Sequence, residues 1–322
     1  MSSPLRLGMI GCGTIAGSHL SAARNNGLPV TAACDVSPQA LGAFLNDVPE
    51  ARGFASAAEL LEQGGVDAVV IGTPPCHHAE TAVAALERGI HVLCEKPLAI
   101  SVEQARAVEK AAAASQAVFM MAFRHRFTAA QQAIKAVLDS GQLGRIILFE
   151  NVFGGPMRQM AGRWFARRAI SGGGALIDTS IHSIDLFRHY CGEIASFGGE
   201  WDRAFEGTDV EDSAVLSLRA ENGALGIVAS SWNFGTGVAG MRILAEKGSV
   251  TYDYQKPKVY HLMRAGETTP EAIEVEATRG VDEQLAHFVR TIAEGIEPCP
   301  GVRDGRRAVE IVEAVYRQRP LP

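Results

Sequence analysis

Short apolar runs alternate with helical patterns over the first 123 residues of the chain. The runs are nearly continuous in hydrophobic residues, as expected for parallel strands that are covered on both faces. They predict strands at residues 5–11, 29–35, 66–73, 91–95 and 118–123. Apolar residues at helical spacing between them predict helices at residues 15–26, 57–63, 78–88 and 102–115. This alternation of strands and helices predicts an α/β fold with a doubly wound parallel sheet.

The pattern changes after residue 123. A helix at 129–138 and a strand at 145–153 come before a glycine loop and a further helix that carries Asp178 and His182. Turn-linked segments then predict strands at residues 213–219, 224–232, 241–245, 249–254, 258–263 and 272–275. Two helices, 281–294 and 303–317, end the pattern. We therefore expect a first domain at 1–123 and a second at 124–322, an α/β domain with a large, mainly antiparallel open sheet.

Composition narrows the class of protein. The chain has 322 residues, a formal net charge of −6 and a hydrophobic content of 47%, which fits a globular protein of about two domains and gives no basic surface for nucleic acid. We find no apolar run near the roughly 20 residues that cross a bilayer, and the first predicted strand leaves no room for a signal peptide. The cysteines are scattered, without disulfide or zinc spacing, so we expect a reducing cytoplasm and no metal site.

A glycine motif stands between the first predicted strand and the first predicted helix. Residues 11–16 read Gly-Cys-Gly-Thr-Ile-Ala and fit G-x-G-x-x-A. Gly11 permits a tight turn, Gly13 lets a pyrophosphate approach the backbone, and Ala16 allows close helix–strand packing. At Thr14 and Ile15 the helix begins, and its free N–H groups attract the anion. The motif predicts a dinucleotide-binding Rossmann domain.

Asp35 ends the second predicted strand, about 20 residues after the glycine motif, where an acid of this fold accepts hydrogen bonds from the adenosine ribose. A carboxylate there also repels a 2′-phosphate. No Arg or Lys follows it over residues 36–39. We therefore expect NAD as the cofactor, in preference to NADP.

The segment 172–182 places a carboxylate and an imidazole four residues apart, just after three glycines. In an α-helix, Asp178 and His182 would lie on one face, about 5–6 Å apart at Cβ. A histidine supported by an acid is what proton transfer near neutral pH requires. A buried pair that only satisfies hydrogen bonds has the same spacing, so this pair alone leaves both interpretations open.

Three motifs together resemble the Gfo/Idh/MocA family of sugar and polyol oxidoreductases. They are Thr-Pro-Pro-Cys-His-His at 73–78, Cys-Glu-Lys-Pro at 94–97, and the glycine-to-histidine stretch at 172–182. The resemblance covers about residues 5–317. It implies that Lys96, Asp178 and His182 are the catalytic residues, with His182 as acid/base, Lys96 polarising the reacting oxygen and Asp178 orienting the imidazole or a substrate hydroxyl. It also implies an open sheet in the second domain that mediates homo-oligomerisation, into a dimer or a tetramer.

The same resemblance implies two groups of binding residues. Around the cofactor we expect Thr73, Pro74, His78, Glu95 and Lys96, in addition to the glycine motif and Asp35. At the substrate we expect Arg126, Trp164, Asp178 and His182. Arg124 and Ser180 depart from the residues usual in the family. Asp185 could be a second orienting acid, but we favour a buried group that makes a helix–loop hydrogen bond. The arginines at 163, 167 and 168 either recognise an anion or are simply solvated.

We therefore expect an NAD-dependent oxidoreductase that moves a hydride between nicotinamide and a secondary alcohol of a sugar, polyol or related cyclic compound. Two alternatives stay open. One is NAD-assisted glycoside hydrolysis, known in the same family, in which the hydride returns and no net NADH appears. The other is a non-catalytic sugar or dinucleotide sensor. The expected partner is a small-molecule substrate, with no nucleic acid and no membrane.

Overall fold

The computed structural model describes residues 4–319, which form two compact units. The first unit holds the chain up to Phe123 together with Val281–Val309, and the second holds Arg124–Gly280 and the residues from Glu310 on. Segment 281–309, which the sequence analysis places in the second domain, thus packs with the first. Asn25 Nδ2 donates to Asp282 Oδ2 at 2.7 Å, and Met121 N donates to Pro300 O at 3.0 Å.

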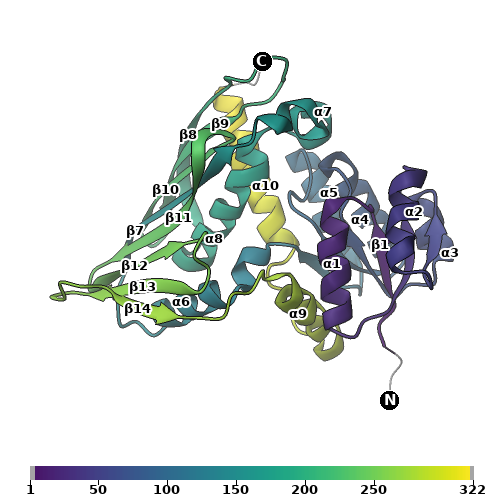
Figure 1. Cartoon of the computed structure of the whole chain (residues 1–322), viewed down its shortest axis with the longest axis horizontal. Coiled ribbons are helices and arrows are strands. Elements are labelled where there is room, and N and C mark those ends of the chain that lie inside the picture. The colour runs from purple at the N-terminus through teal and green to yellow at the C-terminus, as the bar shows by residue number, and fades with distance from the viewer. Residues whose placement is uncertain (1–3, 320–322) are drawn as a thin grey trace. The chain divides into compact units, whose positions relative to one another are not determined.

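The first unit contains a six-stranded parallel sheet in the order β3-β2-β1-β4-β5-β6, with helices on both faces (Figure 1). Its strands are β1 Leu7–Ile10, β2 Val30–Cys34, β3 Arg52–Phe54, β4 Ala68–Ile71, β5 His91–Cys94 and β6 Phe119–Met121. Its helices are α1 Thr14–Asn25, α2 Pro38–Asp47, α3 Ala57–Gln63, α4 His78–Glu87, α5 Val102–Ala114 and α9 Val281–Glu294, with a 3₁₀ turn η1 Pro75–His77. The predicted doubly wound parallel sheet is confirmed.

Two elements of this unit escaped prediction. Strand β3 has three residues, with Phe54 alone buried. In helix α2, Phe44 is likewise the one buried residue, and the apolar stripe of Leu41, Phe44 and Leu45 is too short to set the ends of the helix. Its start is fixed locally instead, because Ser37 Oγ accepts from Ala40 N at 3.3 Å and Pro38 occupies the first turn.

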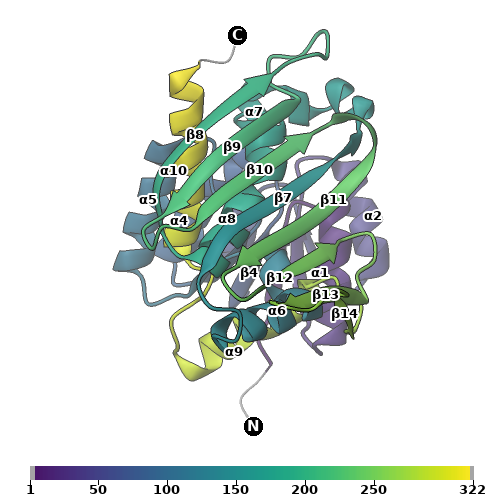
Figure 2. The ribbon, with the colours of Figure 1, turned by 90° about the vertical axis from the view of Figure 1, so that its left-hand side faces the viewer.

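The second unit contains an eight-stranded sheet in the order β14-β13-β12-β11-β7-β10-β9-β8, seen nearly face-on in Figure 2. Its strands are β7 Ile146–Pro156, β8 Ile194–Asp202, β9 Ser213–Ala220, β10 Leu225–Ser231, β11 Asn233–Ala245, β12 Gly248–Asp253, β13 Val259–Arg264 and β14 Glu271–Glu274. Among these strands β7 and β10 pair in parallel, and the other neighbours pair antiparallel. The predicted mainly antiparallel sheet is confirmed.

Helices of this unit are α6 Ala129–Asp139, α7 Arg168–Ser171, α8 Ile181–Cys191 and the end of α10 Val302–Gln318. Shorter turns are η2 Arg124–Phe127, η3 Arg158–Gly162, η4 Trp164–Ala166 and the π-helical η5 Leu176–Ser180. Strands β9 and β10 alternate buried and exposed residues, so one sheet face is packed and the other is open. On the packed face Phe149 of β7 meets Phe187 of α8, with ring centroids 5.6 Å apart.

Within residues 4–319 no helix combines the length and apolar character needed to cross a membrane. The same residues contain no cluster of three or more His, Cys, Asp and Glu arranged to hold a metal ion.

Candidate functional site

The turn between β1 and α1 has the geometry that a dinucleotide requires. Gly11 has φ +91°, and a Cβ built there would lie 2.8 Å from Gly72 C and Thr73 N. Gly13 is different, because its Cβ would meet nothing within 4 Å. No side chain caps the start of α1 at Gly13. The open space beside Gly13 and the free N–H groups of Thr14 and Ile15 therefore fit a pyrophosphate.

Asp35 lies directly after β2 and holds the glycine turn. Its Oδ2 accepts from Cys12 N at 2.8 Å, and its Oδ1 accepts from Ser37 N at 2.8 Å. Each carboxylate oxygen has a further lone pair, so these bonds fix the carboxylate and still allow it to accept from a ribose hydroxyl.

His78 connects the two loops that follow β4 and β5. The side chain is 1% exposed, with Nε2 2.7 Å from Thr73 O and Nδ1 2.7 Å from Pro97 O. Burial lowers the pKa of His78, although both hydrogen bonds and the charge of Glu95 oppose that shift. Since both ring nitrogens are engaged with backbone carbonyls, His78 fixes the loops of the predicted cofactor site and does not present its imidazole to a ligand.

A hydrogen-bonded pair in the first unit was not predicted from the sequence. His19, on α1, places Nε2 2.8 Å from Oε1 of Glu95, and Lys96 N donates to Glu95 Oε2 at 3.3 Å. Burial by itself would raise the pKa of Glu95, but the hydrogen bond and charge of His19, with Lys96 and His78, lower it overall. The pair thus positions the residue before Lys96, at the carboxyl end of β5, the edge where parallel sheets bind ligands.

In the second unit, Asp178 and His182 lie on one continuous helical segment, but not on a regular α-helix. Asp178 belongs to the π-helical η5 and His182 to the first turn of α8. A π-helix bonds residues i and i+5, so the regular α-helix predicted for this segment is wrong at Asp178. Asp178 Oδ2 accepts from Thr179 Oγ1 at 3.3 Å, and Thr179 Oγ1 accepts from Trp232 Nε1 at 3.2 Å. These bonds orient the carboxylate.

His125 is a second histidine at this place, and we predicted no role for it. Its ring meets the ring of His182 edge to face, with centroids 4.7 Å apart. It also lies 5.5 Å from Phe153 and 5.6 Å from Tyr254, centroid to centroid. His182, which is half-buried, thus lies beside a cluster of ring side chains. The cluster consists of His125 on η2, Phe153 on β7 and Tyr254, which directly follows β12.

Arg126 and Asp185 form a buried, bidentate ion pair. Arg126 Nε donates to Asp185 Oδ2 at 2.8 Å and Nη2 to Oδ1 at 2.5 Å. The pair ties the His125 turn to the helix of His182. It engages the guanidinium that we expected to border the substrate, and it confirms the interpretation of Asp185 as a buried hydrogen-bonding group.

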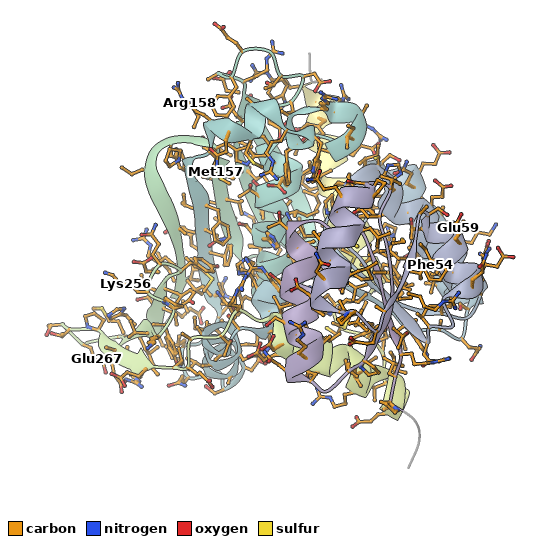
Figure 3. All side chains as sticks on the ribbon, turned by 45° about the vertical axis from the view of Figure 1, so that its right-hand side comes forward. Phe54, Glu59, Met157, Arg158, Lys256 and Glu267 are labelled. Carbon is orange, nitrogen blue, oxygen red and sulfur yellow. The ribbon has the colours of Figure 1, made fainter. Side chains whose placement is uncertain are left out.

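Trp164 lies in the segment that follows β7, whose start is marked by Met157 and Arg158 in Figure 3. Its ring stacks on Phe165 at 3.6 Å, and the guanidinium of Arg163 lies 5.5 Å from the Phe165 ring. Trp164 is half-buried, as a residue that covers a ligand would be. Its contact with substrate stays a prediction.

The predicted site residues thus fall into two groups. The glycine turn, Asp35, and the loops after β4 and β5 with Thr73, Pro74, His78, Glu95 and Lys96 belong to the first unit. Arg126, Trp164, Asp178 and His182 belong to the second. That Lys96 acts on the same substrate atom as His182 stays a prediction.

A parallel sheet with a glycine turn and an acid after β2, joined to an open sheet that carries a histidine helix, defines a two-domain, dinucleotide-dependent oxidoreductase. Residues 5–123 match the model of the "Oxidoreductase family, NAD-binding Rossmann fold", and residues 131–251 match the "GFO/IDH/MocA C-terminal domain". The chain belongs to the Gfo/Idh/MocA family, which confirms the resemblance. Its first unit is an NAD-binding domain.

Several of the named relatives are dehydrogenases. Inositol 2-dehydrogenase 2 of Saccharopolyspora erythraea is 31% identical over 77% of this chain and 73% of its own. Inositol 2-dehydrogenase of Rhizobium meliloti is 26% identical over 97% and 96%. A structure of levoglucosan dehydrogenase in complex with NADH and levoglucosan has a TM-score of 0.91 and 24% identity, over 98% of this chain and 97% of that one. This last likeness supports the fold.

Proposed function

We propose that the protein transfers a hydride between NAD and a secondary alcohol of a sugar, polyol or related cyclic compound. The observation that carries the proposal is the helix with Asp178 and His182 in a chain whose other unit has a dinucleotide turn at Gly11 and Gly13. The names of the relatives, inositol and levoglucosan dehydrogenases, support this class of substrate.

In the proposed reaction, His182 accepts the hydroxyl proton of the substrate as a general base. Bound NAD supplies the hydride acceptor, and the turn at Gly11 and Gly13 with Asp35 would hold it. Asp178, fixed by Thr179, orients the imidazole or a neighbouring substrate hydroxyl. Lys96 donates a hydrogen bond to the reacting oxygen and favours the developing negative charge on it.

A panel of polyols and sugars, followed by NADH absorbance, tests the proposal. Replacement of His182 by Ala should reduce turnover by about 10²-fold or more and leave NAD affinity nearly unchanged, and replacement of Lys96 by Ala should reduce turnover to a similar degree. The matched controls are His77→Ala and Lys110→Ala, since both residues are exposed in the first unit. Unchanged turnover in the His182 variant would refute the assignment of the base.

The same assay separates the two alternatives. Sugar release from a glycoside without net NADH would indicate NAD-assisted hydrolysis. Binding of a sugar without reduction of NAD under any condition would indicate a sensor. The dehydrogenase names of the relatives favour hydride transfer over both.

For the assembly, we propose a homo-oligomer formed through the open face of the eight-stranded sheet. Val215 on β9 and Leu225 and Ile227 on β10 are exposed there, on neighbouring strands. Exposed apolar side chains on neighbouring strands of an open sheet are typical of a subunit interface. Sedimentation of the wild type against Ile227→Lys tests it, and a monomeric wild type would contradict it.

For the compartment, we propose the cytoplasm. All six cysteines are free thiols, and Cys34, Cys94 and Cys191 are buried. A reducing compartment keeps such thiols intact. Fractionation of cells that produce the protein tests this, and recovery outside the cytoplasm would contradict it.

A further inference from the structure

The helix of Asp178 and His182 begins against a carboxylate from a distant part of the chain. Gly174 N donates to Glu211 Oε2 at 2.9 Å, and Leu176 N donates to Glu211 Oε1 at 2.8 Å. Between them, Ala175 N donates to the backbone O of Glu211 at 3.1 Å. Three consecutive N–H groups at the start of the helical segment are therefore satisfied by one residue. Such groups have no partner within a helix and need one from outside.

The hydroxyl of Tyr316, on α10, holds the same carboxylate. It donates to Glu211 Oε1 at 2.9 Å. Both side chains are buried, and Glu211 is fully so. The partners of the carboxylate are thus two amides and one hydroxyl, all neutral donors.

This arrangement explains two glycines of the motif. A Cβ on Gly174 would lie 1.7 Å from Glu211 O, and a Cβ on Gly173 would lie 2.0 Å from the Tyr316 hydroxyl oxygen. Neither distance is possible for a real side chain. The glycines are needed because Glu211 and Tyr316 fill the space beside the loop, so the loop, the acid and the tyrosine form one packed unit.

The buried surroundings of the Glu211 carboxylate disfavour its charged form. Burial raises the pKa of Glu211 to about 7, although the hydrogen bonds from Leu176, Gly174 and Tyr316 oppose that shift. Tyr316 is the titratable side chain in contact with it, and burial and the charge of Glu211 raise its pKa well above the ordinary value. The neighbouring Asp212 is occupied elsewhere, since it accepts from Ala204 N and Phe205 N. An ion buried without a cation costs free energy, which points to a role beyond packing.

We propose that Glu211, held by Tyr316, is a positioning residue for the acid/base His182. Its carboxylate and carbonyl oxygens fix where the helical segment begins. They thereby fix the positions of Asp178 and His182, which follow Gly174 by four and eight residues. Asp178 N donates to Gly174 O at 2.9 Å, so the first turn joins the capped residue directly to the predicted orienting acid. This inference rests on the proposed function, because it assumes that His182 acts on substrate.

Two variants test the inference in the full-length protein. Glu211→Gln replaces one acceptor oxygen by an NH₂ group that faces a backbone donor. Tyr316→Phe removes the hydroxyl alone and keeps the ring. The controls are Glu221→Gln, on the exposed hairpin turn, and Tyr260→Phe, a buried tyrosine on β13. Tryptophan fluorescence verifies that the second unit is folded, because Trp232 contacts the same segment through Thr179.

We expect Glu211→Gln to lower kcat by about 10- to 100-fold, since a displacement of about 1 Å in a reacting group can cost 10²-fold. Tyr316→Phe should lower kcat less, and neither variant should change the Kd of NAD, which binds the other unit. The controls should keep wild-type kcat. A residue that served stability alone would leave kcat unchanged at temperatures where the variant is folded.

Amide hydrogen exchange provides a readout that does not depend on activity. In the wild type, protection at Gly174 and Leu176 should fall as the pH is lowered from about 8 to about 6, after correction for intrinsic rates, because protonation turns an acceptor oxygen of Glu211 into a donor. In Glu211→Gln the same amides should exchange faster and without that pH dependence. Wild-type kcat together with wild-type exchange in this variant would overturn the inference. If the wild type reduces no NAD with any polyol, the proposed function fails, and the exchange experiment still decides whether Glu211 holds the start of the helical segment.

Discussion

Gly11 and Gly13 are two glycines of the same turn, two positions apart. We expect their replacement by alanine to have different consequences. At Gly11 the backbone has φ +91°, and the new Cβ would lie 2.8 Å from the backbone of Gly72 and Thr73. At Gly13 the new Cβ would meet no protein atom within 4 Å. Gly11→Ala should therefore damage the fold, and Gly13→Ala should damage cofactor binding.

The magnitudes follow from these contacts. An L-residue in the left-handed region costs about 1–2 kcal/mol, and an atom forced into packed surroundings costs about 1–3 kcal/mol more. Gly11→Ala should thus lower the free energy of unfolding by about 2–5 kcal/mol, a large fraction of the stability of a typical domain. Gly13→Ala changes the N-cap of α1 and should cost under about 1 kcal/mol. It should weaken the binding of NAD by about tenfold or more, because the new methyl group occupies the space that the pyrophosphate needs.

Urea unfolding followed by far-ultraviolet circular dichroism measures the first quantity, and calorimetric titration with NAD measures the second. The three tryptophans, Trp164, Trp201 and Trp232, all lie in the second unit, so their fluorescence is an internal reference. Equal stability of Gly11→Ala and wild type would refute the steric argument. Wild-type NAD affinity in Gly13→Ala would refute the placement of the pyrophosphate.

Three further outcomes are expected. Asp185→Asn breaks the buried pair with Arg126 and should lower the unfolding free energy of the second unit by about 3–5 kcal/mol, read from tryptophan fluorescence in urea. Glu95 has a lowered pKa, so its pair with His19 stabilises the fold above the ordinary carboxyl pKa and loses that contribution as the pH falls through the lowered value. The difference in unfolding free energy between wild type and Glu95→Gln should therefore shrink in acid, and a difference that grows would contradict the pair. Gly42 lies at an exposed position of α2, and a Cβ there would meet no atom within 4 Å. Gly42→Ala should therefore raise the free energy of unfolding by about 0.5–1 kcal/mol, which a slightly higher thermal midpoint would show.

The sequence predicted most elements because their signals are local. Helices α3 and α9 begin and end at the predicted residues, 57–63 and 281–294. For α3 the cause is visible, since Ser56 Oγ accepts from Glu59 N at 3.2 Å and Gly65, with φ +62°, follows the C-cap residue Gly64. The buried parallel strands were found to within a few residues for a similar reason, because both faces are covered and the apolar run is continuous.

The site was less predictable, because its supports are distant in sequence. His19 and Glu95 are 76 residues apart, and Glu211 lies 37 residues from the amide of Gly174. No motif links such partners. The π-helical turn at Asp178 was missed because a four-residue spacing fits an α-helix equally well. His125 gave no signal either, since its importance arises from an edge-to-face contact with His182 that only folding creates.

The division of the first unit has a consequence for synthesis. Val281–Val309 follows more than 150 residues of the other unit, yet it packs with the N-terminal 123. A ribosome releases the chain from its N-terminus, so the dinucleotide-binding half stays incomplete until almost the last helix has emerged. A fragment that stops at residue 123 would expose the surface of α1 that α9 covers, and it would be a target for chaperones and proteases. Gene fusions that transplant only the N-terminal half should therefore yield an unstable product.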